Sequence, residues 1–444
     1  MKQILLLLFV CCAFGLRGQV ISTVAGGGIG GVINGAPATM AVLSDPTGGI
    51  FDGHGNYYFT EGLGGHRIRK IDPYGIISTV AGTGLSGYTG DNGPATLATL
   101  NAPISVIVDS FNNLYICDVE NFRVRKVNAL TGVISTIAGN GIGGFVTDGV
   151  AATATQISNI EDLCIDKNGN LYIADYGNRR VRKVNTLGVI STFAGSGLPG
   201  YSGDGSRADT CRLGGIAGIC MDQLGNIYLA DNSNSRVFKI NSSGIITTVA
   251  GTGSGYLFNG DNIPATSANI DPYRIAFDKF GNLFISEYHN YRVRVVDHAG
   301  LIHTIAGVGS SGYSGDGDAA TAAKFNFPIG VAFDTCDNLY ISDNGNNRIR
   351  KVTYLECNYL SVDDNQPNIT ITISPNPTTS TLQINNLKTT SQYQLYNMLG
   401  ASIMQGTLKP GNSTLPMDAL EPDIYMLALI DEEGEKTVHK IVKQ

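Results

Sequence analysis

A segment of about 56 residues recurs six times between Val20 and about Val352. Each copy opens on a short apolar signature, and the copies begin at Val20, Ile76, Val133, Val189, Ile245 and Leu301. A unit of this size cannot bury its apolar face alone, so neighbouring copies must pack against one another. The period therefore predicts a solenoid, a propeller or an array.

Four short runs of alternating apolar residues fill each repeat, separated by Gly, Asn and Asp. In the third repeat they are Asp162–Asp166, Leu171–Asp175, Arg180–Val184 and Val189–Ala194, which we name strands a, b, c and d. The 57 glycines and the low charged fraction of 15% suit short strands joined by tight turns. Four such strands form one blade, and blades packed radially leave only short protected edges. We expect an all-β fold whose main part, residues 19–357, is a six-bladed β-propeller.

The two ends of the repeat region predict how the ring closes. The region opens with a d-type strand, Val20–Ala25, and its last repeat stops after the c-type strand Arg348–Val352. We therefore expect the first strand to complete the last blade, which would remove the remaining open edge.

The second half of each repeat has a distinctive pattern: a GN turn, a Y-I-x-D strand and an N-x-R-V-x-K-V strand, as in Gly169–Val184. In all six units this pattern resembles the NHL repeat family. The resemblance implies a six-bladed propeller that serves as a binding platform for protein or RNA. A minority of similar propellers are metal-dependent lyases or lactonases, and the fold alone does not choose among these functions.

Residues present in every repeat are first interpreted as requirements of the blade. An Asp follows strand a in all six copies, where its carboxylate can accept from turn amides. These residues are Asp52, Asp109, Asp166, Asp222, Asp278 and Asp334. A second acidic set ends strand b: Glu61, Asp118, Asp175, Asp231, Glu287 and Asp343. We expect each of these to pair with the arginine that begins strand c, namely Arg67, Arg123, Arg180, Arg236, Arg292 or Arg348.

The long d–a connections are the candidate binding loops, because variable loops on a rigid scaffold usually carry binding. They share a Gly-Tyr-x-Gly-Asp motif followed by an Ala-rich helical turn. The candidate binding residues are Tyr88, Asp91, Tyr201, Asp204, Tyr313 and Asp316. Calcium binding at the Gly-Asp loops is an alternative, although no loop supplies the oxygen ligands of an EF-hand.

The leading functional prediction is a platform for an extracellular protein or glycan, and no catalytic residue is identified. The alternative is a metal-dependent lyase or hydrolase at the channel mouth, but the histidines do not converge from three blades onto one end of the channel. The net charge of −7 disfavours nucleic acid as a partner, and the lack of Trp disfavours a strong lectin. We expect the propeller to be a monomer.

The N-terminal residues 1–18 are typical of a secretory signal peptide, with one Lys, an apolar run from Ile4 to Phe14 and small residues near Gly18. A lipoprotein would need a small residue before Cys11, where Val10 stands. No other apolar stretch is long enough to span a membrane.

Export makes disulfides chemically possible. Cys336 and Cys357 match no repeat position, and we expect a bridge between them. The other cysteines replace small residues of sister repeats and are interpreted as buried fillers: Cys117, Cys164, Cys211 and Cys220.

After a polar linker at residues 358–368, residues 369–444 alternate as short strands, which predicts a small immunoglobulin-like β-sandwich. This segment closely resembles the type A C-terminal sorting domain of the type IX secretion system of Bacteroidota. The positions that carry the resemblance are Pro375, Asn376, Pro377, Tyr396, Asn397, Gly400, Tyr425, Lys440 and Lys443, with Asp423 where the motif normally has Gly. The resemblance implies the type IX secretion machinery as a partner, export across the outer membrane, removal of the domain, and release or surface attachment.

Overall fold

In the computed structural model, the chain divides into two compact units, residues 1–355 and 356–444. The structure describes residues 19–353, 372–374, 378–387, 389–397, 402–421, 424–430 and 436–443. The predicted signal peptide and linker lie outside these residues.

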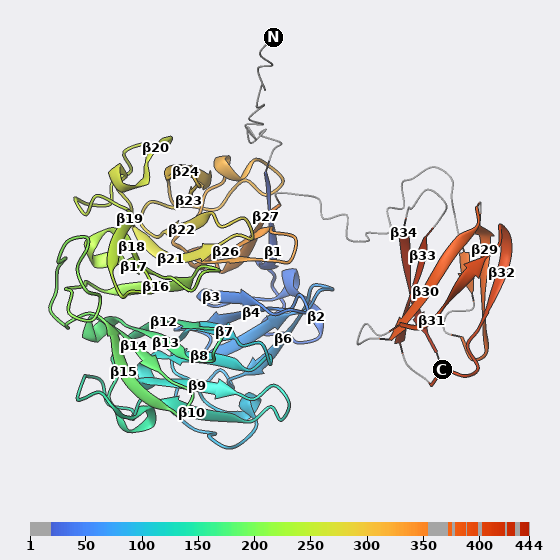
Figure 1. Ribbon diagram of the computed structural model, residues 1–444, viewed down its shortest axis with the longest axis horizontal. Helices are drawn as coiled ribbons and strands as arrows, with labels where there is room; N and C mark the ends of the chain where they lie inside the picture. The colour runs from blue at the N-terminus through green and yellow to red at the C-terminus, as the bar shows by residue number, and fades with distance from the viewer. Residues whose placement is uncertain are drawn as a thin grey trace, which may run out of the picture. The chain divides into compact units, whose positions relative to one another are not determined.

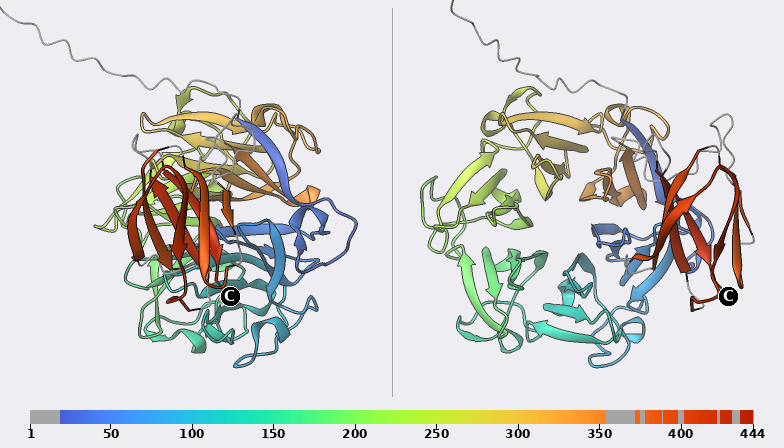
Figure 2. Two further views of the ribbon diagram at one scale, coloured as in Figure 1. Left: turned by 90° about the vertical axis from the view of Figure 1, so that its right-hand side faces the viewer. Right: turned by 45° about the vertical axis from the view of Figure 1, so that its right-hand side comes forward.

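The strands of residues 19–353 form six sheets of four or five strands, arranged as a ring in Figure 2. Strand a of each sheet, in chain order, is β3 Pro46–Phe51, β7 Pro103–Val108, β12 Ile160–Ile165, β16 Ile216–Met221, β21 Pro272–Phe277 and β25 Pro328–Phe333. Each of these strands packs against the next, and β25 packs against β3, so the six a strands surround a central channel. This is a propeller, as the sequence predicts, and we number its sheets 1 to 6 from β3.

The b and c strands form a hairpin in each sheet. The b strands are β4 Tyr57–Glu61, β8 Leu114–Asp118, β13 Leu171–Asp175, β17 Ile227–Asp231, β22 Leu283–Glu287 and β26 Leu339–Asp343. The c strands are β5 Arg67–Ile71, β9 Arg123–Val127, β14 Arg180–Val184, β18 Arg236–Ile240, β23 Arg292–Val296 and β27 Arg348–Thr353. In four of the hairpins a three-residue 3-10 helix follows strand b: η3 Val119–Asn121, η5 Tyr176–Asn178, η6 Asn232–Asn234 and η9 Asn344–Asn346.

The outer strand d of sheets 1 to 5 comes from the same repeat, and that of sheet 6 comes from the start of the described chain. The d strands are β6 Ile76–Ala81, β10 Ile134–Ala138, β15 Val189–Ala194, β19 Ile246–Ala250, β24 Leu301–Ala306 and, for sheet 6, β1 Val20–Gly26. Strand β1 lies beside β27 (Figure 1), and their antiparallel pairing places Ile21 opposite Val352. The predicted closure of the ring is therefore confirmed.

The d–a connections run over the outer edges of the sheets. In sheets 1, 3 and 5 a two-residue strand pairs with strand d: β2 Ala36–Pro37, β11 Val150–Ala151 and β20 Ile263–Pro264. The predicted Ala-rich turn forms a 3-10 helix in five repeats: η1 Ala38–Met40, η2 Ala95–Leu97, η4 Ala152–Ala154, η7 Ala265–Ser267 and η8 Ala320–Ala322. Its first alanine is buried in each case. The connections thus cover edges that would otherwise pair with other chains.

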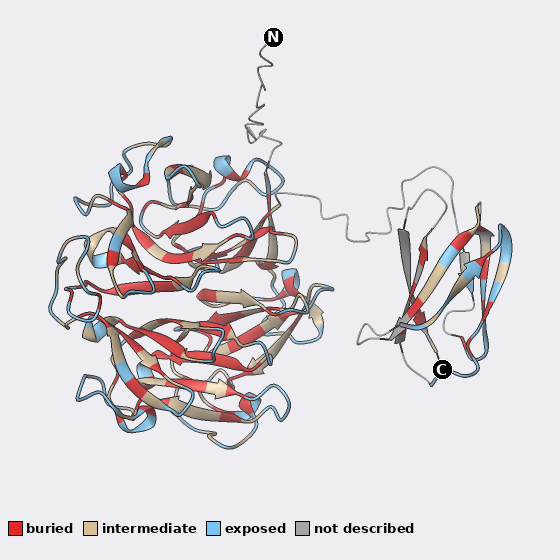
Figure 3. Cartoon of the chain, in the orientation of Figure 1, coloured by how far each residue is buried: buried red, intermediate tan, exposed pale blue. Residues whose placement is uncertain are grey.

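Buried residues run along the a, b, c and d strands of the ring, and exposed ones gather in the connections (Figure 3). Apolar clusters join each sheet to the next, as where Ile107 of sheet 2 packs with Leu163 of sheet 3. Within the described residues, no helix is long and apolar enough to cross a membrane.

The second unit contains two sheets around one apolar core that includes Leu382, Leu395 and Leu427. The first sheet consists of β28 Thr372–Ser374, β29 Thr381–Leu387 and β32 Gly411–Pro416. The second consists of β31 Ser402–Leu408, β30 Ser391–Asn397, β33 Ile424–Ile430 and β34 Lys436–Val442.

Candidate functional site

The acidic residues after strand a stabilise the a–b turns, as predicted. Asp52 accepts from the backbone amides of His54 and Asn56 at 2.9 Å and from the Asn56 side chain at 2.8 Å. The same contacts recur at the five sister positions. These hydrogen bonds to the ionised form help to lower the pKa of Asp109, Asp166 and Asp222 against the opposing effect of burial. Their repetition marks them as structural.

The predicted pairing at the b–c hairpin is wrong in its partner. The carboxylate that ends strand b pairs with the third residue of strand c, not the first. The pairs are Arg69–Glu61 at 3.1 Å, Arg125–Asp118 at 3.1 Å, Arg182–Asp175 at 3.6 Å, Arg294–Glu287 at 3.7 Å and Arg350–Asp343 at 3.4 Å. In sheet 4 the third residue of strand c is Phe238.

The first arginine of strand c lies at the open end of the hairpin and donates to carbonyls instead. Arg123, for example, donates to the carbonyls of Asn121 at 2.9 Å and Asn140 at 3.0 Å. Both arginines lie on one face of the strand, because they are two residues apart. Only the second, Arg125, is fully buried, and a buried charge requires a counter-charge more strongly than a half-exposed one does.

The predicted binding residues of the d–a loops take part in a contact that binds each loop to the sheet whose strand a follows it. Asp91 pairs with Arg125 at 2.7 Å, and the Tyr88 hydroxyl donates to Asp91 at 2.8 Å. The Tyr88 ring lies beneath Arg123, with the guanidinium carbon 3.7 Å from the ring centre. Tyr313 and Asp316 repeat this arrangement in sheet 6 with Arg348 and Arg350, and Tyr201 also donates to Asp204. Tyr88 and Tyr313 are still 40% and 43% exposed, so their contact with a ligand stays a prediction.

Sequence comparison between repeats points to a second region. The third residue of strand a differs in chemistry from sheet to sheet, being Gly48, Ser105, Asp162, Gly218, Arg274 and Gly330 in chain order. The Arg274 side chain extends from sheet 5 across the channel and donates to the carbonyls of Ala217 and Glu161, the latter at 2.6 Å. It also lies 3.8 Å from the Asp162 carboxylate and 3.9 Å from that of Glu161. Arg274 thereby connects sheets 3, 4 and 5 inside the channel.

The acidic partners of Arg274 are themselves held in place. Asp162 accepts from the Ser105 hydroxyl at 2.6 Å and from the Ile219 amide at 2.9 Å. Glu161 accepts from the Tyr273 hydroxyl at 3.3 Å. Burial raises the pKa of Glu161, and the nearby Arg274 opposes that shift.

A group of aromatic side chains lies next to Glu161 and Arg274, and we call it the mouth cluster: Tyr273, Tyr288, His289 and Phe327. Tyr288 stacks on Tyr273 with ring centres 5.3 Å apart and on Phe327 with ring centres 4.5 Å apart. His289 packs edge-on against Tyr288 at 4.8 Å. Tyr273 is the second residue of β21 and Phe327 immediately precedes β25, and Tyr288 and His289 lie in a b–c hairpin. The cluster therefore lies on the face that bears the d–a loops and b–c hairpins.

Sequence reasoning missed the mouth cluster, although a signal was present. Sister repeats place Gly62, Val119, Tyr176, Asn232 and Asn344 where sheet 5 has Tyr288. The prediction rested on residues shared by every repeat, whereas the mouth cluster is not shared: at the position of Tyr288 only sheet 3, with Tyr176, also has an aromatic residue. Such departures are less easily explained as requirements of the blade.

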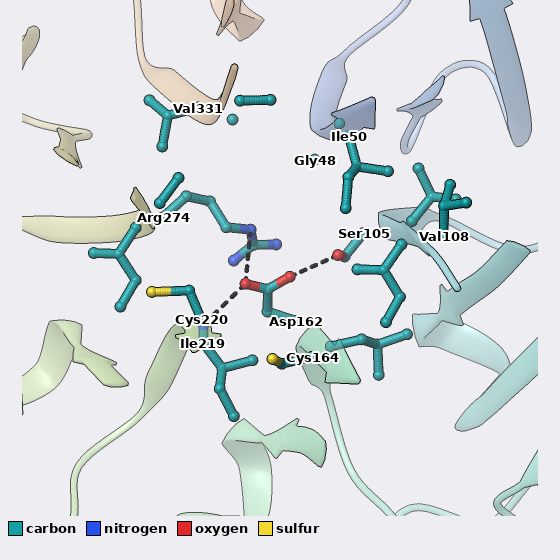
Figure 4. A pocket seen from close by; sticks show the side chains of 18 of the residues that line it. Gly48, Ile50, Ser105, Val108, Asp162, Cys164, Ile219, Cys220, Arg274 and Val331 are labelled. Carbon is teal, nitrogen blue, oxygen red and sulfur yellow. Dashed lines mark hydrogen bonds and ion pairs between the residues drawn. The ribbon is translucent and has the colours of Figure 1, made fainter. Parts of the chain in front are cut away.

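On the other side of Arg274 the channel widens into a cavity of ≈ 440 Å³, lined by all six a strands. Figure 4 shows Arg274, Asp162 and Ser105 together at the cavity among apolar side chains. Cys164 and Cys220 also line it and are only partly buried, so the prediction that the four cysteines at small-residue positions of the repeat are buried fillers holds only for Cys117 and Cys211. The small side chains at the positions of Cys164 and Cys220 face the channel rather than a closed core.

Cys336 is disulfide-bonded. Its predicted partner, Cys357, lies outside the described residues.

Three of the described histidines have separate partners. His289 contacts Asp271 at 2.9 Å, His303 contacts Asp297 at 2.9 Å, and His66 accepts from the Ala102 amide at 3.1 Å. Among the residues that the structure describes, no group of three or more His, Cys, Asp or Glu is arranged to hold a metal ion.

The sorting-motif residues are only partly described. Tyr425 is buried, and its hydroxyl donates to the Glu421 carbonyl at 2.9 Å. Tyr396 and Asn397 end β30, and Lys440 lies in β34. Lys443 forms an isolated backbone β-bridge with Thr378. Pro375, Asn376, Pro377 and Gly400 lie outside the described residues.

Comparison with protein families identifies both units. Residues 372–444 match the secretion system C-terminal sorting domain, and residues 158–184, 213–240 and 325–352 match the NHL repeat. The sorting domain indicates type IX export to the cell surface or the extracellular space.

Curated relatives match part of the chain. The chain is 27% identical over 284 residues to the Arabidopsis thaliana protein SUPPRESSOR OF QUENCHING 1, chloroplastic, covering 61% of this chain and 26% of that protein. It is 26% identical over 330 residues to the human NHL repeat-containing protein 2, covering 67% and 45%, respectively. It is 30% identical over 230 residues to human Teneurin-4, covering 46% of this chain but 8% of that protein. The chain thus spans only a minor part of each of these relatives.

Solved structures share the fold. An auxiliary nutrient binding protein from Bacteroides thetaiotaomicron aligns with a TM-score of 0.57 at 18% identity, covering 76% of both chains. Another auxiliary nutrient binding protein, from Bacteroides ovatus, aligns with a TM-score of 0.55 at 16% identity, also covering 76% of both chains. Taken with the family matches, the ring of sheets shows that this is an NHL-repeat β-propeller protein with a C-terminal sorting domain.

Proposed function

We propose that the propeller is a non-catalytic module that binds a neutral extracellular glycan at the mouth cluster. The observation that carries this proposal is that the stacked Tyr273, Tyr288 and Phe327 belong to one sector of the ring and depart from the repeat. Aromatic rings that are not needed by every blade, placed beside a channel mouth, offer flat apolar surface to sugar rings.

Polar groups around the cluster support the same ligand class. Glu161 and Asp271 lie beside it. Asp271 is buried and already bonded to His289, whereas the Glu161 side chain keeps 16% of its surface exposed and its carboxylate can accept hydrogen bonds from sugar hydroxyls. Together with the net charge of −7, these carboxylates favour a neutral polymer over an acidic one. The tyrosines Tyr88, Tyr201 and Tyr313 of the d–a loops would form the outer rim of the same contact surface.

The test is an array of neutral and acidic polysaccharides probed with the exported protein. Tyr288→Ala should weaken binding to the best neutral glycan roughly tenfold, because it removes the central ring of the stack. Tyr176→Ala is the matched control, since Tyr176 occupies the same hairpin position in sheet 3. Equal losses in the two variants would count against the mouth cluster, and binding to a surface protein instead of any glycan would replace the proposed ligand class.

A further inference from the structure

The channel cavity differs from the mouth cluster in chemistry and in access. Arg274 and Asp162 close its end towards the d–a loops, and its other end is lined by the last residues of the a strands, among them Phe51, Phe277 and Phe333. Because strand a runs from the d–a loop to the a–b turn, a small molecule would enter from the face that bears the a–b turns.

The closed end contains an unsatisfied donor. The Arg274 side chain is only 4% exposed, and its Nε has no hydrogen-bond acceptor. The nearest carboxylate oxygen, Oδ2 of Asp162, is 3.8 Å from Nε, which is too long for a hydrogen bond. A buried donor without an acceptor is costly, so a ligand or water that supplies one acceptor atom would stabilise this end of the cavity.

Charge at the closed end restricts what that acceptor can be. The Asp162 and Glu161 carboxylates already lie within 4 Å of the Arg274 guanidinium. An anionic ligand would therefore meet two carboxylates that already neutralise the arginine, and it would lose its own hydration. A neutral carbonyl, ether or hydroxyl oxygen can accept from Nε without that penalty.

The cavity walls and volume determine the polarity and the size of the rest of the ligand. Ile50, Ile107, Ile275 and Val331 line the cavity from four different sheets, and apart from Arg274, Asp162 and Ser105 the lining side chains are apolar or thiol-bearing. A volume of ≈ 440 Å³ lies at the lower end of the range for small-molecule sites. It suits one compact small molecule better than an oligomer.

We propose that the channel cavity binds a compact, neutral, apolar molecule with one hydrogen-bond acceptor placed at Arg274 Nε. The site is separated from the mouth cluster by Arg274 itself, so it does not depend on the proposed glycan binding. A small ketone represents the ligand class.

The first experiment compares three probes of nearly equal size on the exported protein by titration calorimetry. We expect acetophenone to bind with a Kd in the range of tens to hundreds of micromolar. Ethylbenzene lacks the acceptor and should bind roughly five- to tenfold more weakly, and benzoate, which is anionic, should bind most weakly. Absence of acetophenone binding, or a preference for benzoate, would overturn the proposal.

Two variants locate the site. Ala276→Leu places a larger side chain in the cavity wall and should weaken acetophenone binding at least tenfold, whereas Ala129→Leu, at an exposed c–d turn, should not change it. Arg274→Lys keeps the charge but removes Nε, and should abolish the preference for acetophenone over ethylbenzene. Unchanged binding to Ala276→Leu would place the probe elsewhere.

A measurement on the unaltered protein covers the case in which the Arg274 variant does not fold. Cys164 and Cys220 line the cavity, whereas Cys117 and Cys211 are buried outside it. Saturating acetophenone should slow modification of Cys164 and Cys220 by methyl methanethiosulfonate at least threefold, read by peptide mass spectrometry. Cys117 and Cys211 should be modified slowly with or without the probe. Equal rates at Cys164 and Cys220 in both conditions would contradict the proposal.

Discussion

At the scale of single residues, the side chain at the third position of strand c links the outer parts of each sheet. In five sheets it holds an arginine that is fully buried. In sheets 2, 3, 5 and 6 this arginine bridges the carboxylate that ends strand b and an aspartate of the d–a loop, as Arg125 bridges Asp118 and Asp91. In sheet 4, Phe238 stacks on Tyr201 instead, with ring centres 5.3 Å apart. The hairpin and the loop are therefore held by one side chain.

Substituting the two arginines of one c strand separates their contributions. Arg125→Met leaves two acidic side chains without their counter-charge and should lower the free energy of unfolding by about 3–5 kcal/mol. Arg123→Met removes hydrogen bonds to two carbonyls and should cost about 1 kcal/mol. Denaturant unfolding followed by circular dichroism measures both. A larger loss for Arg123→Met would mean that the first arginine is the main partner after all.

The pKa of Glu287 predicts a pH dependence of stability. Burial raises this pKa from 4.5 to about 7, against the effect of Arg294. The folded state therefore holds the proton more tightly than the unfolded state, and this stabilisation is complete below pH 4.5 and is lost as pH rises through about 7. Glu287→Gln mimics the protonated form, so its stability relative to the unaltered protein should rise with pH, by at most about 1.4 kcal/mol per pH unit.

Asp222 provides a control of opposite sign for that experiment. Its pKa is lowered, with hydrogen bonds from Asn226 and the Lys239 charge outweighing burial, so its carboxylate contributes stability above pH 3.8 that is lost as pH falls. Asp222→Asn should therefore become more destabilising, relative to the unaltered protein, as pH rises from 3 to 5. Thermal unfolding of both variants between pH 3 and pH 8 tests the two signs, and parallel curves for Glu287→Gln and the unaltered protein would contradict the assignment.

Sequence reasoning succeeds here where the determining contacts are local. In the third repeat the bounds of strands b, c and d are as predicted from alternation, and the Asp52-type turns follow from contacts two to four residues apart. Strand a is the exception, since β12 runs Ile160–Ile165 where Asp162–Asp166 was predicted. The partner of Asp118 was misassigned because sequence spacing does not show which arginine is buried. Arg274 was not identified because its partners, such as Ala217 and Glu161, come from other sheets and become neighbours only when the ring closes.

At the scale of elements, the connections protect the edges that the strands leave open. Loop residues bond to the outer d strands, as where the Asn92 amide donates to the Ile134 carbonyl at 2.8 Å. Strand β1 performs the same task for β27 and is itself bonded by the Asp318 carbonyl and the Gly317 amide. The long loops that the sequence suggests as binding segments thus have a structural task, which explains why their motif recurs.

Deleting Val20–Gly26 should destabilise the propeller by several kcal/mol. It exposes the outer edge of β27 and removes Ile21, which is fully buried, from the apolar cluster of sheets 5 and 6. The melting temperature measures the loss, and Ser22→Ala, at a half-buried position of the same strand, is the control. A synthetic peptide of residues 19–26 should restore part of the melting temperature, since β1 is bound only through strand pairing and side-chain packing. An unchanged melting temperature on deletion would show that the ring is stable without β1.

At the scale of the whole molecule, two units with separate cores divide two tasks. The propeller presents the mouth cluster and the channel cavity, which are the candidate ligand sites. The second unit has its own core of residues such as Leu382 and Leu427 and matches the sorting domain. A recognition signal in a unit with its own core can act on whatever precedes it, because its fold does not depend on the neighbouring unit.

This division predicts what happens when the two units are separated in a host that has the type IX system. A chain that ends at residue 371 should accumulate in the periplasm as a folded propeller, because the signal for outer-membrane export is missing and the first unit keeps its own core. A secreted reporter protein joined to residues 358–444 should reach the surface, and the same fusion with Tyr425→Asp should not, since Tyr425 is buried in the core of the second unit. Cell fractionation and surface proteolysis measure all three. Normal surface levels of the truncated chain would show that the propeller carries its own export signal, whereas failure of the reporter fusion alone would show that export also requires part of the propeller.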